Sequence, residues 1–546
     1  MRFWFAVTFL LLLISGLAWR MVYLMVLNRD FLLTQSNARV LRVIDIPAYR
    51  GMIVDRNSKP LAVSTPVDSV WINPSQFNAE PQDLTELCRL LDIPLVDLQQ
   101  HLKQDPEREF MYIKRRLNPA LAAQVKGLNI PGVYLQREYR RYYPEGEIAA
   151  HILGFTNIDD QGQEGLELAY NDWLRGVPGK KKVIKDRLGH IIANLQVIQE
   201  PQPGHELPLS IDRRIQYLAY RELKDAVERY KAASGSVIVV DVKTGEILAM
   251  VNQPSYNPNN RPQDHDGRYR NRAITDVFEP GSTAKAFSVA NAFMHGNFTP
   301  ETPVDTSPGW MRVEGKVVRD IHNNGYIDVT RVLQKSSNIG VTKLTLAVPP
   351  ETLWTTLHNL GFGQPTAINF PGESSGFLPF HKKWHPFTLA TLSFGYGFSV
   401  TNLQLVQAYT TLAAGGLKRP LSLLKVDAPK AGEQVIEPKV ARQVLTMLET
   451  VVEEGGGAIR ANVPGYTVAG KTGTVRIVGP HGYDPHRHIG FFVGVAPAAN
   501  PRLVISVMIN DPQAGGYYGG IVAAPVFSKV MAGALRIMEV PPEVTQ

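Results

Sequence analysis

The sequence predicts a protein of mixed α and β structure that is held in a membrane by a single N-terminal helix. Residues 3–19, "FWFAVTFLLLLISGLAW", carry no charge, and the apolar character resumes after Arg20 and continues to Leu27. Beyond this stretch, short β-like runs are mixed with helical ones, and no second apolar stretch of this kind follows. With 546 residues, 44% of them hydrophobic, the chain can bury a large core and is long enough for more than one domain.

The N-terminal apolar stretch is long enough to span a bilayer once its continuation to Leu27 is included. Arg20 then lies near the far interface, where its aliphatic stem can extend toward the head groups. No small-residue cleavage site follows, which favours an uncleaved anchor over a secretory signal peptide. Only Arg2 precedes the span, whereas Arg29, Arg39 and Arg42 follow it. The positive-inside tendency therefore does not place the large domain outside.

Charge and cysteine content exclude some classes of function. The chain has 57 basic and 50 acidic residues, a net charge of +7, and no dense polybasic run, so no nucleic-acid partner is expected. The mild positive charge fits work near an anionic surface such as a membrane or cell wall. The lone Cys88 lies in a helical pattern and is expected to be a core residue, without an intramolecular disulfide.

The soluble part divides into two regions. Residues 28–200 mix β-like runs such as "GMIVDR" with helical runs such as "PQDLTELCRLLD", and the Pro-bearing stretch "QEPQPGHEL" (199–207) is typical of a linker. A helix is expected next, capped by Ser210 or Asp212. Its apolar positions recur at helical spacing: Ile215, Leu218, Leu223, Ala226, Val227 and Tyr230.

The tripeptide Lys-Thr-Gly occurs twice, in different settings. The first copy, residues 243–245, separates two β-rich runs, 237–242 and 247–251. Gly245 suits the positive-φ position of a hairpin turn, and Lys243 is expected to point into water. This copy is interpreted as a turn.

The second copy, residues 471–473 in "GYTVAGKTGTVRIV", lies inside a β-branched run. Because strand side chains alternate, Thr472 and Thr474 place two hydroxyls on one face. Gly473 leaves the strand bare, where another element is expected to approach closely, although a bulge is an alternative. This strand is expected to be an edge that binds an extended peptide, with hydroxyls available for a carboxylate.

A Ser-x-x-Lys motif follows the chain break at Glu279-Pro280-Gly281 in "DVFEPGSTAKAFSVANAF". Ser282 and Lys285 are three residues apart at the start of an Ala-rich helix, so they share one face. A serine needs an adjacent base to become a nucleophile, and a lysine whose pKa is lowered by burial can supply one. This segment is the best candidate to approach Gly473.

A third element, Ser336-x-Asn338 in "VLQKSSNIGVTKL", places a hydroxyl and an amide after a helical segment. Both remaining motifs also have second copies: Ser422 to Lys425, which has a strand pattern, and Ser255-Tyr256-Asn257, which is typical of a loop. No single match is informative. The well-placed copies, however, occur in the order 282, 336 and 471, and could converge on one cleft.

This set of motifs resembles the active site of the penicillin-recognising serine transferases and hydrolases, which use the three motifs in this order. The segments "RGMIVDRNSKPLAVS" (50–64), "RRYYPEGEIAAHILGFTN" (140–157) and "GQEGLE" (162–167) are similar to the non-catalytic module of class B penicillin-binding proteins. "YNPNN", "RNRAITDVFEPGST", "LQKSSNIG", "LSFGYG" and "INDPQAGGYYGG" resemble the FtsI-type cell-division peptidoglycan D,D-transpeptidase. Asn338 agrees with this type, since elongation-specific relatives usually carry an acidic residue there.

The resemblance covers the chain from about Asn28 to the C-terminus and implies an α+β fold in three parts. Residues 1–27 are a cytoplasmic stub and transmembrane anchor, residues 28–200 an elongated non-catalytic pedestal of the dimerisation type, and residues 201–546 a transpeptidase domain whose antiparallel sheet is flanked by helices. FtsI-type proteins usually have a longer cytoplasmic tail than the Met-Arg seen here, so either the tail is short or the true start lies upstream.

The resemblance also implies a reaction. Ser282 attacks the penultimate D-alanine of a stem peptide ending in D-Ala-D-Ala, Lys285 accepts its proton with help from Ser336, and an amine from another stem receives the acyl group. The N–H groups of Ser282 and Thr474 are expected to form the oxyanion hole.

Substrate contacts are implied as well. Lys471, with the Thr472 and Thr474 hydroxyls beside Gly473, is expected to hold the carboxylate, and Asn338 to position the acylated peptide. Tyr517 and Tyr518 are expected to form an aromatic wall, with a packed loop as the alternative. No metal or other cofactor is expected. The histidines in "PHGYDPHRH", which follow in an expected loop, lack a standard zinc spacing: His481, His486 and His488.

The implied setting is the cell inner membrane at the division septum, with the catalytic domain in the periplasm. The expected partners are peptidoglycan stem peptides, β-lactams, an FtsW-type glycan polymerase and other membrane proteins of the division complex. Three alternatives have less support. A serine β-lactamase is disfavoured because no E-x-x-L-N element lies between Ser336 and Lys471, and a bifunctional synthase is disfavoured because the region before the linker lacks glycan polymerase motifs. A degenerate structural subunit is disfavoured because every catalytic position is filled.

Overall fold

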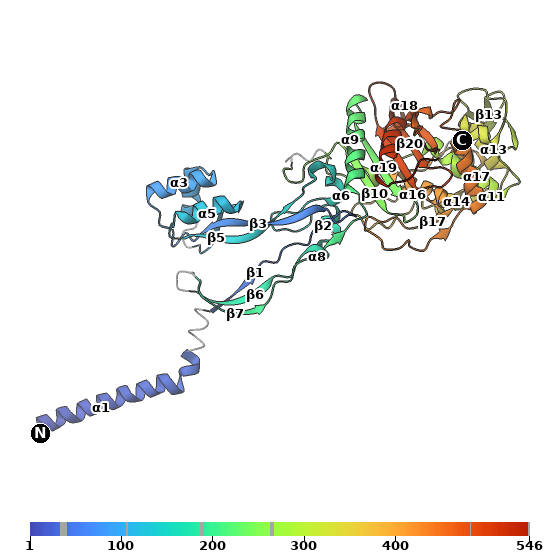
Figure 1. Cartoon of the computed structure of the whole chain (residues 1–546). Coiled ribbons are helices and arrows are strands. Elements are labelled where there is room, and N and C mark those ends of the chain that lie inside the picture. Colours follow the sequence, from blue (N-terminus) through green and yellow to red (C-terminus); the bar gives the residue numbers. More distant parts are fainter. Residues whose placement is uncertain (33–40, 105–107, 186–190, 262–266, 481, 544–546) are drawn as a thin grey trace. The chain divides into compact units, whose positions relative to one another are not determined.

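The computed structural model describes residues 1–32, 41–104, 108–185, 191–261, 267–480 and 482–543 (Figure 1). The chain divides into two compact units that alternate along the sequence. The N-terminal unit comprises residues 1–51, 64–140 and 172–205, and the C-terminal unit comprises residues 52–63, 141–171 and 206–546. The region before the linker therefore contributes two segments to the C-terminal unit.

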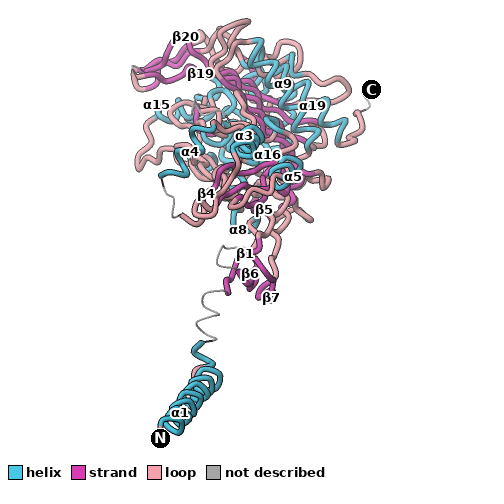
Figure 2. The backbone as a smooth tube through the Cα atoms, turned by 90° about the vertical axis from the view of Figure 1, so that its left-hand side faces the viewer, coloured by secondary structure: helices cyan, strands magenta, loops and turns pink. Residues whose placement is uncertain are grey.

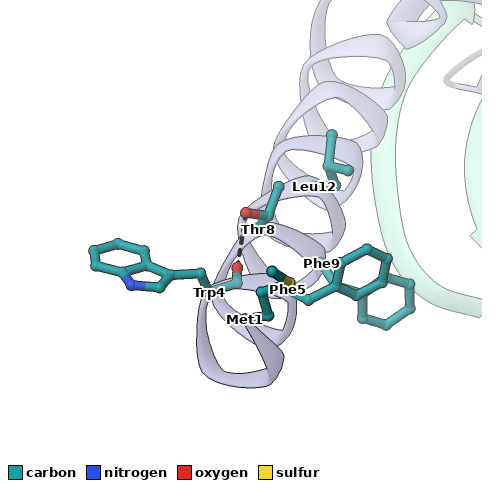
Figure 3. Close-up of a pocket in the computed structure, with 6 residues that line it drawn as sticks. All are labelled: Met1, Trp4, Phe5, Thr8, Phe9 and Leu12. Atoms are coloured by element: carbon teal, nitrogen blue, oxygen red, sulfur yellow. Dashed lines mark hydrogen bonds between the residues drawn. The ribbon is translucent and has the colours of Figure 1, made fainter.

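Helix α1 (Arg2–Val22) continues as a π-helical turn to Leu27, and none of its residues is buried. Figure 3 shows its first turns, with Trp4, Phe5 and Phe9 projecting from the helix. The hydroxyl of Thr8 donates to the carbonyl of Trp4 at 2.9 Å, so the polar group in this apolar surface is satisfied. Residues 2–27 form a helix long and apolar enough to cross a membrane, and the described ranges contain no other.

In the N-terminal unit, the helices within residues 81–127 pack around a core of their own. Cys88 of α3 lies in this core at 6% exposure, together with Leu98 and Val125, so its predicted burial is confirmed. The helices are α3 (Pro81–Leu91), α4 (Leu95–Gln104) and α5 (Pro119–Gly127). The strands that lie wholly or partly in this unit are β1 (Leu41–Ile46), β3 (Pro60–Ile72), β4 (Met111–Leu117), β5 (Val133–Tyr142), β6 (Gly179–Lys185) and β7 (Ile191–Gln199). Strands β1, β6 and β7 form one antiparallel sheet.

The segment 141–171 packs within the C-terminal unit. Asn259 exchanges hydrogen bonds with the backbone of Tyr143, and Nε2 of His151 donates to the carbonyl of Arg268 at 2.7 Å. Burial lowers the pKa of His151 to about 4, so its ring is neutral. The short elements here are η2 (Gly146–Ile148), α6 (Ala150–Leu153) and α7 (Gly165–Ala169), while β2 (Ile53–Val54) pairs with β8 (Leu207–Pro208). Helix α8 (Asn171–Leu174) begins at the end of this segment and lies mostly in the N-terminal unit.

The C-terminal unit is built on a five-stranded antiparallel sheet in the order β10-β9-β21-β20-β19. Its paired strands β19 and β20 lie side by side in Figure 2. The strands are β9 (Ser234–Asp241), β10 (Ile247–Gln253), β19 (Ala469–Gly479), β20 (Gly482–Ala496) and β21 (Leu503–Asn510). Strands β10, β9 and β21 are buried along their whole length except at Asn510. The two edges of the sheet are β10 and β19. The predicted antiparallel sheet and the predicted edge position of residues 471–474 are confirmed.

Helices cover both faces of this sheet. Phe492 contacts Phe527 of α19 on one face, whereas Ser506, which is paired with Val493 on the opposite face, donates to Asn402 of α16. Helix α9 packs on α19 and begins at the cap Asp212, one of the two predicted. The longer helices are α9 (Arg213–Arg229), α11 (Lys285–His295), α13 (Asn338–Leu346), α14 (Thr352–Asn359), α15 (Pro386–Ser393), α16 (Asn402–Ala413), α17 (Pro438–Glu449) and α19 (Ala524–Ile537).

Short elements connect these layers. The helical ones are α10 (Arg272–Thr275), η3 (Gly281–Ala284), α12 (Val329–Gln334), η4 (Ile459–Ala461) and α18 (Gly519–Val522). The paired short strands are β11 (Val277–Phe278) with β16 (Val400–Thr401), β12 (Pro303–Asp305) with β15 (Tyr326–Asp328), β13 (Trp310–Val313) with β14 (Lys316–Arg319), and β17 (Leu417–Lys418) with β18 (Glu433–Gln434).

Candidate active site

Ser282 lies half-buried in the 3₁₀ turn η3, directly before α11 begins at Lys285. Gly281 has a φ of +48°, and a Cβ there would lie 2.7 Å from Cγ1 of Val475 on β19. A side chain at position 281 is therefore excluded by both the backbone conformation and the neighbouring strand. This contact sets the turn that carries Ser282 against β19, as the sequence predicted for the segment as a whole.

Lys285 is buried, at 1% exposure, and its Nζ has two oxygen partners. It donates to the carbonyl oxygen of Ser336 at 2.6 Å and to the Ser336 hydroxyl at 3.1 Å. Burial holds the pKa of Lys285 well below its usual value, the charge of Lys471 lowers it further, and the charge of Asp320 opposes the shift. The predicted lowering by burial is confirmed.

The Ser336–Asn338 segment joins α12 to α13. Ser336 has a φ of +55°, an uncommon conformation for a non-glycine residue. Ser337 caps α13 by accepting from the N–H of Gly340 at 2.9 Å. The amide nitrogen of Asn338 donates to the carbonyl of Arg319 at 2.9 Å. The two helices thus bring the Ser336 oxygens to Lys285.

Lys471 on β19 is also buried, at 1% exposure, and burial lowers its pKa to about 8. It pairs with Val493 and so lies on the sheet face that carries α16. Thr472 and Thr474 lie on the opposite face, and both are half-buried. The hydroxyl of Thr474 accepts from the N–H of Gly519 at 3.0 Å, which leaves its own proton available to a ligand.

The approach to Gly473 differs from the prediction. The atoms nearest to a Cβ at this position belong to the Phe491 ring, the closest at 2.0 Å, and not to the Ser282 segment. Phe491 pairs with Gly473 across the strands, and its ring contacts Phe278 at a centroid distance of 5.0 Å. The bare strand accommodates an aromatic side chain from its own sheet, and the glycine that allows the Ser282 segment to approach is Gly281.

Tyr517 and Tyr518 are exposed and form a stack with a third ring. Tyr517 lies 4.0 Å from His488 with an interplanar angle of 15°, and 4.5 Å from Tyr518 at 31°. His486 and His488 lie in strand β20 and not in the expected loop, because the pairing of β19 with β20 extends to Gly479 and Gly482. His481 lies outside the described residues.

The second copies of the motifs have the conformations that the sequence predicted. Gly245 has a φ of +76° in the turn between β9 and β10, with Lys243 exposed. Ser422 lies in an extended segment, bridged to Glu246, and Ser255 lies in a loop. Among the residues that the structure describes, none of these second copies contacts Lys285.

Sequence reasoning missed two acidic residues at this site. Asp320 follows β14 and binds the start of α13, while Glu279 accepts from the N–H of Gly397 at 2.9 Å and from the Tyr483 hydroxyl at 2.8 Å. Neither belongs to a motif. The only signal for Glu279 was its place beside Pro280, and Asp320 had none.

The geometry can support acyl transfer by a serine. A neutral lysine amine has two N–H groups and one lone pair. The two Ser336 oxygens can take both N–H groups of Lys285, which leaves the lone pair to accept a proton from Ser282, one helical turn away. A second lysine, Lys471, supplies positive charge for an anionic group.

Comparisons with known proteins agree with this geometry. Residues 235–532 match the penicillin binding protein transpeptidase domain, and residues 45–209 match the penicillin-binding protein dimerisation domain. The chain is 44% identical to peptidoglycan D,D-transpeptidase FtsI of Escherichia coli over 98% of this chain and 91% of that protein. It is 43% identical to the probable peptidoglycan D,D-transpeptidase PbpC of Pseudomonas aeruginosa over 99% of this chain and 96% of that protein.

A solved structure extends the likeness to the whole fold. The peptidoglycan synthetase of Bifidobacterium adolescentis matches with a TM-score of 0.74 and 26% identity, over 93% of this chain and 98% of that one. The apolar helix α1 and the FtsI relatives fit a single-pass inner membrane protein. The chain belongs to the penicillin-binding peptidoglycan D,D-transpeptidases, with a dimerisation domain before its transpeptidase domain.

Proposed function

We propose that this protein cross-links peptidoglycan stem peptides at the division septum through an acyl-enzyme on Ser282. The observation that carries the assignment is the buried Lys285 amine, bound at 2.6 Å and 3.1 Å to the two oxygens of Ser336 and one turn from Ser282. A buried lysine with a lowered pKa serves as a base near neutral pH.

In the first half-reaction the Ser282 oxygen attacks the carbonyl carbon of the penultimate D-alanine, and its proton passes to Nζ of Lys285. The N–H groups of Ser282 and Thr474 stabilise the oxyanion. The intermediate then breaks its C–N bond, the proton passes to the leaving amine, and terminal D-alanine departs from the acyl-enzyme.

In the second half-reaction the amine of a neighbouring stem peptide attacks the ester carbon of the acyl-enzyme. Lys285 accepts the proton of that amine and returns one to the Ser282 oxygen as the ester bond breaks. Asn338, held by Arg319, positions the acylated peptide, and Tyr517 with Tyr518 forms a wall of the cleft.

The Thr472 and Thr474 hydroxyls donate to the terminal carboxylate of the donor stem, and Lys471, on the other face of the same edge strand, attracts this carboxylate by its charge. The Thr474 hydroxyl accepts from Gly519, so its proton is free to be donated to that carboxylate. A β-lactam presents a carboxylate and a reactive carbonyl in the same way, which makes this site its target. No metal or other cofactor takes part in these steps.

Membership of the family supports the cellular assignment that we propose. We assign residues 1–27 to the segment with the membrane anchor, residues 28–200 to the pedestal, and residues 201–546 to the transpeptidase domain, which we place in the periplasm. An FtsW-type glycan polymerase and other membrane proteins of the division complex are the partners proposed for this chain.

The test is mass spectrometry of the covalent adduct formed with a fluorescent penicillin. We expect a single adduct on Ser282, none in Ser282→Ala, and full labelling in the matched control Ser422→Ala. Full labelling of Ser282→Ala together with loss in Ser422→Ala would overturn the assignment. Rapid hydrolysis of the adduct would favour a hydrolase over a transpeptidase.

A further inference from the structure

Asp320 binds the start of α13 from outside the three motifs. Its Oδ1 accepts from the N–H of Asn338 at 2.6 Å and from the N–H of Ile339 at 3.0 Å. Its Oδ2 accepts from the hydroxyl of Ser337 at 2.5 Å and from the side-chain amide of Asn324 at 3.4 Å. The first N–H groups of a helix have no partner within the helix, and its dipole favours a negative charge there.

These bonds fall on the residues that follow Ser336. The left-handed φ of +55° at Ser336 is strained for a residue with a side chain, so the surrounding structure must hold it. From the α12 side, the N–H of Ser337 donates to the carbonyl of Val332 at 2.9 Å. From the α13 side, the Asp320 carboxylate is the group that fixes Ser337 and Asn338.

The end of β14 thereby holds both functional parts of the Ser-x-Asn motif. The carbonyl of Arg319 accepts from the side-chain amide of Asn338. The carboxylate of the next residue, Asp320, accepts from the backbone N–H of Asn338. The Ser336 carbonyl and hydroxyl, which receive Lys285, directly precede this fixed segment. A shift of α13 would move both acceptors away from the lysine.

We propose that Asp320 is a positioning residue for acylation, holding Ser336 in the conformation that receives Lys285 and setting the pH range of the reaction. The inference rests on the proposed function of Ser282 and Lys285. Among the described residues, the charged groups that act on Lys285 are Lys471 from β19 and Asp320 after β14. Asp320 is the negatively charged one of these two groups, and it opposes the effect of burial on Lys285.

The two contributions of Asp320 can be separated by substitution. Asp320→Asn keeps a carbonyl acceptor for the α13 N–H groups but removes the charge, whereas Asp320→Ala removes both. We expect the acylation rate constant with fluorescent penicillin to fall about tenfold in Asp320→Asn and about 100-fold in Asp320→Ala, since a small misplacement of reacting groups has effects of this size.

The pH profile distinguishes positioning from a general loss of stability. Acylation needs neutral Lys285, so the rate rises as pH passes the pKa of that amine. Because Asp320 raises this pKa, both variants should move the acidic limb of the profile to lower pH. Asp328→Asn is the matched control, since Asp328 caps α12 by accepting from the N–H of Arg331 at 2.7 Å without contacting the Ser-x-Asn motif.

The full-length membrane protein is to be used, with thermal unfolding measured in parallel. Equal rates and equal acidic limbs in the wild type and Asp320→Asn would overturn the proposal, as would the same changes in Asp328→Asn. Ser282→Ala separates the proposed function from the proposed role of Asp320. If it still forms the adduct, the proposed function fails; if it forms none while both Asp320 variants acylate normally, only this inference fails.

Discussion

The two Lys-Thr-Gly tripeptides of this chain have the same side chains and opposite physical settings. In the turn between β9 and β10, Lys243 is exposed and Gly245 has a φ of +76°. On β19, Lys471 is buried at 1% exposure and Gly473 is in extended backbone. Burial lowers the pKa of Lys471 to about 8. The two copies therefore differ in desolvation and strand position, and not in residue type.

The largest expected effect separates the two lysines. Lys471→Ala removes the positive charge beside Lys285, and we expect the acylation rate constant to fall about 100- to 1,000-fold, the usual result of removing a preorganised electrostatic group from an active site. Lys243→Ala, its matched control, should acylate at the wild-type rate. The measurement is the second-order rate of labelling by fluorescent penicillin. Similar losses in both variants would contradict the distinction between turn and strand.

The next effect separates the two glycines. An alanine at 473 would place its Cβ 2.0 Å from the buried Phe491 ring, which in turn contacts Phe278 and lies beside Gly281. The displaced ring should disturb the Ser282 turn, and we expect acylation to fall about 10- to 100-fold in Gly473→Ala.

Gly245→Ala should act on stability instead. It forces a side chain into positive φ, and its Cβ would lie 2.7 Å from the carbonyl of Pro420, so we expect a loss of about 1 kcal/mol or more in unfolding free energy. Acylation by the folded fraction should be unchanged. Thermal unfolding and labelling rates, measured on the same samples, report the two effects. A Gly245→Ala protein of wild-type stability that acylates slowly would contradict the assignment of Gly245 to a turn outside the active site.

The sequence predicted this contrast well because it depends on local patterns. A glycine between two β-rich runs indicates a turn, and a glycine inside one indicates a strand. The order of the motifs and the burial of Lys285 were predictable for the same reason. The residue that packs on Gly473 could not be predicted, because Phe491 lies opposite Gly473 only through the register of β19 and β20.

Contacts between distant segments account for the other differences. Asp320 lies 17 residues before Ser337 and is joined to it only in the folded unit, so no motif could mark it. Segment 141–171 precedes the linker yet packs in the C-terminal unit, through contacts such as that of Tyr143 with Asn259. His486 and His488 were expected in a loop because the strand that holds them is irregular. The register of the β19–β20 pair shifts between Arg476 and Val478, and the extra residues on β20 interrupt the alternation that indicates a strand.

The last prediction concerns pH. Lys471 is cationic below its pKa of about 8 and neutral above it. If its charge attracts the carboxylate of a stem peptide or β-lactam, acylation should fall about tenfold for each pH unit above 8, since the protonated fraction falls by that factor. Lys471→Arg keeps its charge at all these pH values, so the alkaline limb should move above pH 10 even if the absolute rate is lower. Lys243→Arg, its matched control, should retain the wild-type limb, since an exposed turn lysine takes no part in binding the carboxylate. A limb that stays near pH 8 in Lys471→Arg would assign the titration to another group, and the buried lysine would then act through its shape and hydrogen bonds more than through its charge.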